Sequence, residues 1–291
     1  MSDIRVTVLA ENTGYRRGLR AEHGLSLCIE TNDKKILFDT GQSDLLLHNA
    51  KTLGIDLAQT DAIVLSHGHY DHVGGLERIL DLAPRARVYL HPRALEPKFS
   101  NSSGMVREIG VTSVMRRQLE DRIRSGRGAY TPVTTEISPG VAVTGQIPRV
   151  SGFEDTAGQF FLDRECQKPD GFLDDQALFL DGRDGLVVVL GCAHAGVVNT
   201  LEHLRQVEPD TKIHAVLGGM HLVHAAEARV QQTVDALRRF DIDRIGPAHC
   251  TGGQAARQLW NSLGQRCFQC CVGTQVSFLT VRYRHKVGSN R

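Results

Sequence analysis

Residues 63–76 read IVLSHGHYDHVGGL, and this stretch decides how the rest of the chain is interpreted. The apolar run 63–65 predicts a short strand, and the apolar spacing from Val73 onward is typical of a helix. Between them lie three histidines and one aspartate within six residues. A solvated polar loop is the alternative, but imidazole and carboxylate groups at this density are typical metal ligands. The stretch therefore predicts a metal site whose remaining ligands come from elsewhere in the chain.

The motif His67-x-His69-x-Asp71-His72 resembles that of the metallo-β-lactamase superfamily. Further blocks resemble its subgroup of archaeal-type dihydropterin-methyl-ribofuranosylaminobenzene phosphate synthases, and they occupy residues 21–26, 37–41, 191–196, 218–222 and 249–252. The resemblance implies an α/β (α+β) fold, a four-layer αββα sandwich with a dinuclear metal site between its two sheets. Because the blocks span almost the whole chain, we expect a single domain over residues 1–291.

Composition limits the classes of partner. A chain of 291 residues buries a sizeable core without disulfides, so its seven cysteines are interpreted as reduced thiols. The cluster Cys267-x-x-Cys270-Cys271 is interpreted as structural, with a redox or metal pair as the alternative. A formal net charge of +1 gives no general attraction to nucleic acid or acidic membranes, and no apolar run reaches the roughly 20 residues that span a bilayer. No secretory signal begins the chain, so we expect a cytoplasmic protein.

Hydrophobic patterning predicts strands and helices in both halves of the chain. Such an order favours helices packed over sheets. Strands are expected at 5–10, 25–30, 35–39, 61–65, 87–90, 141–144, 177–180 and 186–190, and helices at 43–53, 197–207 and 225–240.

Residues 95–130 show no strong periodicity, and this length favours a lid or substrate loop. The segment contains Arg116, Arg117, Arg122, Arg124 and Arg127. Arginine binds phosphate oxygens bidentately, so the group is a candidate site for a phosphorylated substrate. The acidic residues 120–121 interrupt it, and a solvated helix face is the equal alternative.

The resemblance also implies a ligand set. His67 and His69 would bind the first metal ion, Asp71 and His72 the second, and His249 would complete the second set. We expect one or two zinc ions, and iron or manganese fits the same ligand types.

The chain departs from the superfamily pattern at the remaining ligands. No histidine lies between His91 and His194, and Gly191-Cys192 stands where the bridging aspartate normally occurs. We expect His194 to be the missing ligand, with Cys192 and then His91 as alternatives.

Six further residues are candidates for substrate binding. In the family, the loop from residue 11 to residue 24 faces the metal site, and the segments 144–149 and 174–176 also match the subgroup. The expected substrate-binding residues are Glu11, Asn12, His23, Asp175, Arg149 and His221.

These residues favour a metal-dependent hydrolase that uses a metal-bound water on a small substrate, with phosphorylated compounds among the candidates. Asp71 is the catalytic candidate, either as a metal ligand or as a proton acceptor. The subgroup resemblance offers the first alternative, transfer of a dihydropterin-methyl group to an aminobenzene ribofuranosyl phosphate. A non-catalytic metal-binding or sensing protein is the second alternative. The substrate would thus be a small molecule, phosphorylated or pterin-like, and the sequence does not indicate an oligomeric state.

Overall fold

Strands that are apolar on both faces explain the layered architecture. In the run 185–190, Leu186, Val188 and Leu190 point to one core, while Val187 and Val189 point to another. Side chains of a strand alternate between faces, so a strand with no polar position is covered on both sides. The second core lies between two sheets and the first lies between a sheet and its helices.

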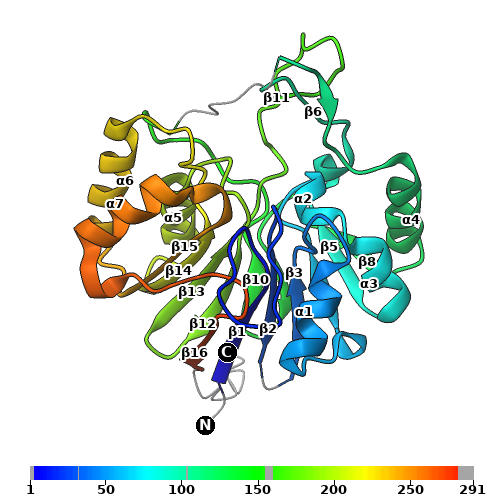
Figure 1. The fold of residues 1–291 in the computed structure, drawn as a ribbon, viewed down its shortest axis with the longest axis horizontal. Coiled ribbons are helices and arrows are strands. Elements are labelled where there is room, and N and C mark those ends of the chain that lie inside the picture. The colour runs from blue at the N-terminus through cyan, green and yellow to red at the C-terminus, as the bar shows by residue number, and fades with distance from the viewer. Residues whose placement is uncertain (1–2, 32, 103, 155–159, 281–291) are drawn as a thin grey trace, which may run out of the picture.

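The computed structural model describes residues 3–31, 33–102, 104–154 and 160–280, and two mixed sheets face each other at its centre (Figure 1). The first sheet has the order β16-β1-β2-β3-β4-β5-β8 and the second has the order β15-β14-β13-β12-β10-β9. Strands of the first sheet are β1 (Asp3–Ala10), β2 (Ser26–Glu30), β3 (Lys35–Phe38), β4 (Ala62–Val64), β5 (Arg87–Leu90), β8 (Gly128–Tyr130) and β16 (Gln275–Leu279). Strands of the second are β9 (Thr135–Ser138), β10 (Val141–Val143), β12 (Leu178–Gly182), β13 (Gly185–Leu190), β14 (Ile213–Gly219) and β15 (Arg244–Ala248).

Helices cover the outer face of each sheet. On the first sheet pack α1 (Leu45–Leu53), α3 (Leu76–Leu82) and α4 (Ser113–Arg124), and on the second pack α5 (Val197–Val207), α6 (Glu227–Arg239) and α7 (Gly253–Leu263). The two groups of helices lie on opposite sides of the sheets in Figure 1. The expected four-layer αββα sandwich is therefore confirmed.

Most predicted elements agree with the structure, including the hairpin of β2 and β3, which pair antiparallel from Leu27 with Phe38 to Glu30 with Lys35. Within residues 95–130, the arginines 116–124 lie on the helix α4, which agrees with the alternative of a solvated helix face rather than with a continuous loop. Only Met115 and Leu119 of this helix are buried, so its charged sequence hides the apolar spacing. Arg122 donates to the carbonyl oxygens of Pro84 and Ala86, which ties α4 to the end of α3.

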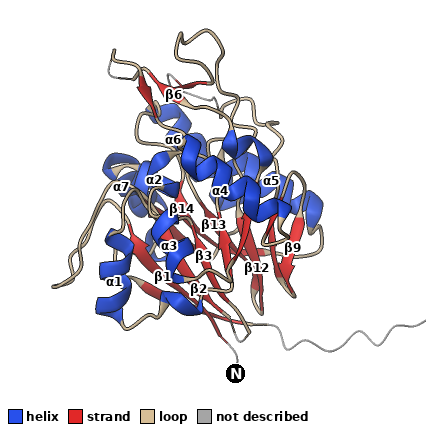
Figure 2. Ribbon diagram, turned by 90° about the vertical axis from the view of Figure 1, so that its right-hand side faces the viewer, coloured by secondary structure: helices blue, strands red, loops and turns tan. Residues whose placement is uncertain are grey.

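The remaining part of that segment joins a small third sheet, with β11 (Phe160–Phe161), β6 (Phe99–Ser100) and β7 (Arg107–Glu108) in that order. In Figure 2, β6 stands beyond one end of the two large sheets. At that end β4 and the parallel strands β13, β14 and β15 reach their carboxyl ends. Loops that follow parallel strands meet at one edge, where α/β folds commonly bind ligands.

None of the helices in the described part of the chain combines the length and the apolar character that crossing a bilayer requires.

Candidate metal centre

The loop between β4 and the short helix α2 (Tyr70–Val73) is held from two directions. The backbone amide of Gly68 donates to Asp174 Oδ2 at 2.9 Å. A side chain at Gly68 would place its Cβ 2.1 Å from the carbonyl oxygen of Ala94, so only glycine fits. This close approach fixes where His67 and His69 point.

Three buried histidines form one half of the site, which we name the histidine half: His67, His69 and His194. The ring centroids are 4.5 Å apart for His67 and His69, 4.8 Å for His67 and His194, and 4.9 Å for His69 and His194. Burial lowers the pKa of each ring well below the usual histidine value, so all three are neutral. The Nε2 atoms of all three, and His194 Nδ1, are buried without a hydrogen-bond partner among the described residues.

Such unpaired buried nitrogens cost free energy unless something binds them. Neutral imidazole is the form that coordinates zinc and similar ions. Among the described residues, His67 and His194 of this half form a set with Cys192 whose donor atoms all lie within 4.8 Å of one another, and such a set could hold a metal ion. Phe172 stacks on the ring of His194 with centroids 4.1 Å apart and keeps its orientation.

The other half of the site, named the carboxylate half, gathers around Asp71. Its Oδ2 atom lies 3.1 Å from His23 Nε2, 3.3 Å from His249 Nε2 and 3.7 Å from His72 Nε2. Burial opposes ionisation of Asp71, but the neighbouring histidines outweigh it and lower the pKa of the carboxyl group. Burial likewise opposes the charge on His72, yet Asp71 and Asp39 raise the pKa of His72 to about 9.

Asp39 connects the two halves from behind. Its Oδ2 atom accepts from Ser66 Oγ at 2.6 Å and lies 2.6 Å from His72 Nδ1, and its Oδ1 atom accepts from the Ser66 amide at 2.7 Å. Because Ser66 donates its hydroxyl proton to Asp39, the same hydroxyl accepts from His67 Nδ1 at 2.9 Å. One carboxylate thereby directs the Nε2 atoms of His67 and His72 toward the site, as outer carboxylates do for metal-binding histidines.

His249 follows β15 and takes a left-handed backbone conformation with φ 50°. Glu11 Oε1 accepts from the His249 amide at 2.7 Å, and Asn12 Oδ1 lies 2.9 Å from His249 Nδ1. With Nδ1 engaged, His249 presents Nε2 to Asp71.

Cys192 and His194 follow β13 and lie on either side of Ala193, which has φ 52°. Cys192 Sγ lies 3.2 Å from His72 Nε2. Two sets of donor atoms within 4.8 Å of one another include this cysteine, one with His67 and His194 and one with His72 and His249. Burial raises the pKa of the Cys192 thiol.

Four residues that were expected to bind substrate lie behind the ligands instead. Glu11 and Asn12 hold His249, as described above. Arg149 Nη1 donates to the His194 carbonyl at 2.9 Å, and Asp175 Oδ2 accepts from the Ala195 amide at 2.8 Å. These contacts position the ligand loops, and the expected role of the four residues in substrate binding stays a prediction. Burial raises the pKa of Asp175 to about 7.

His91 also lies outside the cluster, because its Nδ1 atom accepts from the Arg93 amide at 3.2 Å within the turn that follows β5. Of the three alternatives for the missing ligand, the structure thus brings together His194 and Cys192.

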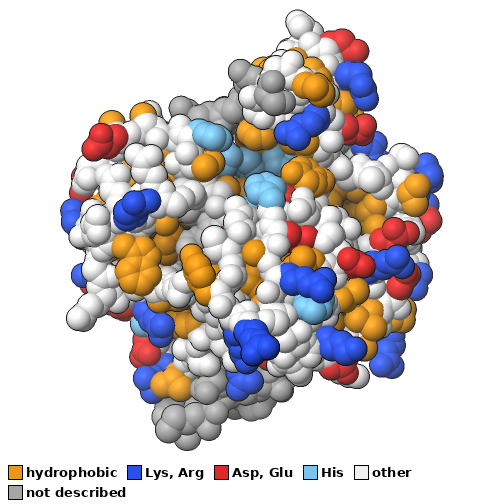
Figure 3. All heavy atoms as spheres, in the orientation of Figure 1, with side chains coloured by type: hydrophobic (Ala, Val, Ile, Leu, Met, Phe, Trp, Pro, Cys, Tyr) orange, Lys and Arg blue, Asp and Glu red, His pale blue; other side chains and the backbone are white. Residues whose placement is uncertain are grey.

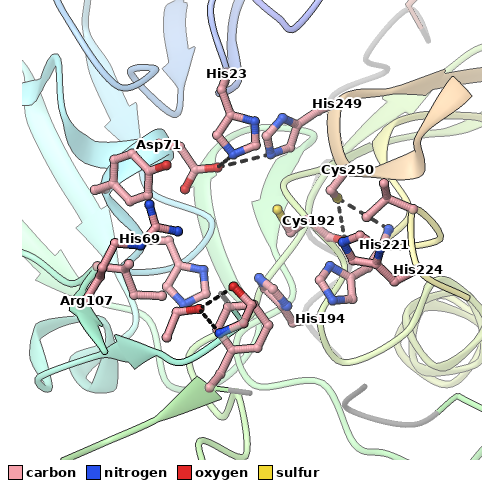
Figure 4. A pocket seen from close by; sticks show the side chains of 16 residues that line it. His23, His69, Asp71, Arg107, Cys192, His194, His221, His224, His249 and Cys250 are labelled. Carbon is pink, nitrogen blue, oxygen red and sulfur yellow. Dashed lines mark hydrogen bonds and ion pairs between the residues drawn. The ribbon is translucent and has the colours of Figure 1, made fainter. Parts of the chain in front are cut away.

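A cavity of about 210 Å³ opens over both halves. Figure 3 shows histidine side chains gathered in this hollow, and Figure 4 shows its lining. The lining residues are His23, His69, Tyr70, Asp71, Ser100, Ser102, Arg107, Ile109, Phe160, Cys192, His194, His221, Val223, His224, His249 and Cys250. Asp71 supplies the one carboxylate among these described residues, and Arg107 supplies the fixed positive charge.

The arginines expected to bind a phosphorylated substrate are therefore not the arginine that lines the cavity. Arg116 and Arg117 belong to α4 on the outer face of the first sheet and do not line the cavity, whereas Arg107 does. Sequence reasoning also missed Lys98, which is 1% exposed and donates to Asp170 Oδ2 at 2.7 Å and Asp174 Oδ1 at 3.0 Å. Lys98 thus holds the carboxylate that anchors Gly68.

Comparisons with known proteins agree with this geometry. Over 268 residues, the chain is 30% identical to the 7,8-dihydropterin-6-methyl-4-(beta-D-ribofuranosyl)-aminobenzene-5'-phosphate synthase of Methanocaldococcus jannaschii, and the match covers 88% of this chain and 90% of that protein. An uncharacterized protein of the same organism is 32% identical and covers 87% of this chain and 93% of its own length.

A crystal structure described as a metal-dependent hydrolase of the beta-lactamase superfamily superposes with a TM-score of 0.80 at 29% identity, covering 94% of this chain and 98% of that one. Residues 19–204 match the family model described as the metallo-beta-lactamase superfamily. The sandwich, the ligand loops at one edge of it and these likenesses lead to one conclusion: the chain belongs to the metallo-beta-lactamase superfamily.

Proposed function

We propose that this chain is a metal-dependent hydrolase that acts on a small anionic substrate. The observation that carries the proposal is the set of buried, unpaired imidazole nitrogens that opens into a cavity beside an ionised carboxylate. A purely structural zinc site is closed by four protein ligands. Ligands that line an open cavity argue against the non-catalytic alternative.

The ligand set follows from the two halves of the site. His67, His69 and His194 would hold one ion, and Asp71, His72 and His249 would hold another. Zinc suits these neutral imidazoles and this carboxylate, and iron and manganese accept the same ligands. Bound ions of this kind lower the pKa of water and polarise the bond that the water attacks.

The protein's own groups provide a route for protons. His23 is about half exposed and bonds to Asp71 at 3.1 Å, so it connects the buried carboxylate to solvent. Hydrogen bonding to Asp71 raises the pKa of His23. His23 can therefore exchange a proton with water while Asp71 stays ionised. Phe160, which lies 5.5 Å from the ring of His69, excludes water from the opposite wall.

The charges at the cavity select the substrate. Arg107, on β7, presents a guanidinium to the opening, while the one lining carboxylate is engaged by three histidines. An anionic group such as a phosphate fits this opening, because arginine binds phosphate oxygens through paired donors. We assign residues 98–102 and 104–109 to the substrate loop within the segment 95–130, since Ser100, Ser102 and Ile109 line the cavity.

A matched pair of variants tests this proposal. Arg107→Gln should raise KM about tenfold for a phosphoester, the loss of about 1.4 kcal/mol of binding free energy, and leave KM for a neutral ester unchanged. Arg117→Gln, on the exposed face of α4, is the control and should leave both values unchanged. Equal effects of Arg107→Gln on both substrates would refute recognition of the anion, and protein without bound metal or hydrolytic activity would refute the hydrolase itself.

A synthase activity is the second candidate, because the 30% identity to the Methanocaldococcus jannaschii enzyme extends over 88% of the chain. In that case the protein would join a dihydropterin-methyl group to an aminobenzene ribofuranosyl phosphate. Incubation in water labelled with oxygen-18 separates the two reactions. Hydrolysis places the label in a product, whereas transfer between two organic substrates does not.

The proposed location is the cytoplasm, where thiols stay reduced. All seven cysteines are free in the structure. Cys267 packs in the core under the helices of the second sheet, and Cys270 packs between the sheets, which supports a structural role for that cluster.

A further inference from the structure

Cys192 occupies the centre of the site, between the two halves. Its sulfur is 3.2 Å from His72 Nε2 in the carboxylate half. It also lies within 4.8 Å of the donor atoms of His67 and His194 in the histidine half, and within the same distance of His249. In Figure 4 the side chain of Cys192 stands between those of His249 and His194. Among the described residues, one set of donors contains His67 and another contains His72. Cys192 is the residue that belongs to both of these sets.

The backbone around Cys192 is built to hold this position. Gly191 approaches the first sheet so closely that a Cβ atom would lie 2.1 Å from Ser66 Oγ. A Cβ atom at Gly219, on β14, would lie 3.3 Å from the Cα atom of Cys192. The next residue, Ala193, has a left-handed backbone conformation. This conformation costs conformational free energy in a residue other than glycine, and such strained residues are common at functional sites. The end of β13 is thus held between Ser66 of the first sheet's side and the neighbouring strand β14.

We propose that the Cys192 thiolate is a metal ligand shared by the two halves of the site, an inference that rests on the proposed function. When sulfur binds the metal, the S–H bond breaks, the electron pair stays on sulfur and the proton leaves to solvent. A thiolate between the two ions adds negative charge where the histidine half has none. Thiolate is a softer ligand than carboxylate, so this site favours zinc or ferrous iron over manganese.

Cys250 is the nearby thiol that provides a matched control. Its Sγ atom accepts from the His221 amide at 3.3 Å and lies 3.4 Å from the Cys192 carbonyl oxygen. Its sulfur also interacts with the side chains of Cys192 and His221, but it belongs to none of the donor sets found among the described residues. The two cysteines share a cavity but differ in their neighbours.

Cobalt titration of the metal-free protein tests the proposal, because a cobalt–thiolate bond gives a charge-transfer absorption band in the near ultraviolet. Wild type and Cys250→Ser should show the band, and it should grow through two equivalents of cobalt. Cys192→Ser should lose it. Cys192→Asp, which replaces the thiolate by a carboxylate, should bind two equivalents without the band and accept manganese more readily. Proton release on metal binding should be larger in wild type than in Cys192→Ser by one proton per protein.

Survival of the band in Cys192→Ser would overturn the assignment. Growth that stops after the first equivalent would overturn the sharing and leave Cys192 with one half only. Protein that binds no cobalt at all would refute the proposed metal-dependent function together with this inference, so the two failures are distinguishable. Circular dichroism of the metal-free variants reports whether each is folded, and Cys192→Ala provides a second substitution if the serine variant is not.

Discussion

The two halves of the site differ in charge although they share one cavity. In the histidine half, burial keeps His67, His69 and His194 neutral, and their inward nitrogens have no partner among the described residues. In the carboxylate half, Asp71 is ionised and His72 has a pKa raised to about 9. The histidine half has unpaired nitrogens that a cation could bind, whereas the charged groups of the carboxylate half form ion pairs with one another.

This difference implies an order of metal binding. A cation entering the histidine half displaces no proton from an imidazole, since these rings are already neutral. Entry into the carboxylate half must first remove the proton of His72 and break its contact with Asp71. We expect the histidine half to fill first at neutral pH.

The largest effect is expected when one ligand is removed from each half of the site. His67→Ala and His249→Ala should each lose one or more metal ions and lower kcat/KM by more than about 100-fold, because even outer partners of metal ligands contribute about 10- to 100-fold. His48→Ala, on α1, should change neither value. Elemental mass spectrometry on folded protein measures the metal content, and full retention would remove that histidine from the ligand set.

Asp39 joins the halves, so Asp39→Asn should weaken metal binding in both. The variant removes the negative charge and replaces one of the two acceptor oxygens that serve His72 and Ser66 by a donor amide, so metal affinity should fall by about 10- to 100-fold. Competition with a chromophoric chelator measures each ion separately. The surface variant Asp243→Asn, whose carboxylate pairs with His214, is the control. Weakening confined to one ion would show that the two halves do not depend on the same carboxylate.

Metal-free protein should reveal the charged half through the pH dependence of its stability. The pKa of His72 is higher folded, at about 9, than unfolded, at 6.5. Protonation therefore stabilises the fold fully below pH 6.5, and this contribution is lost as pH rises to 9. Relative to His72→Gln, the free energy of unfolding should fall by about 3 kcal/mol across that window. Parallel curves for the two proteins, measured by denaturant titration with chelator present, would contradict the ionised state of His72.

The smallest effect is expected at the exposed edge of the carboxylate half. His23 is about half exposed, and exposed ion pairs contribute roughly 0.2–1 kcal/mol. His23→Gln should therefore change metal affinity by less than about fivefold. The pH profile of kcat should change instead, because the variant lacks the imidazole that exchanges protons with water. A large loss of bound metal would assign His23 to the ligands.

Local sequence predicted the first ligands because they lie within six residues of one strand-to-helix turn. The four layers were predicted from the family resemblance, and the apolar run 186–190 agrees with them because its side chains pack into two different cores. The remaining donors occur singly, Cys192 and His194 after β13 and His249 after β15, and only the parallel arrangement of β13, β14 and β15 brings them together. The family resemblance, rather than spacing, pointed to His249.

Long-range partners explain what the sequence could not predict. Asp39 lies 27 positions before Ser66, and Lys98 lies 76 positions before Asp174, so neither pairing leaves a local pattern. Arg149 was expected to bind substrate because residues 144–149 match the family subgroup, and its distant backbone partners leave no pattern in the sequence. Its donors are in fact taken by the carbonyl oxygens of His194 and Glu154. Asp39 did leave a clue, since it stands at the end of a strand within one of the family blocks.

The separation of the two halves along the chain also affects how the protein is made. His72 and His249 are 177 positions apart yet their Nε2 atoms lie 3.2 Å from each other. At about 5–20 residues per second, a ribosome completes the second ligand roughly 9–35 s after the first. During that interval the nascent chain carries a dense histidine motif without the second sheet that shapes it. Binding of a metal ion by both residues would therefore follow synthesis of the last parallel strand, late in the making of the chain.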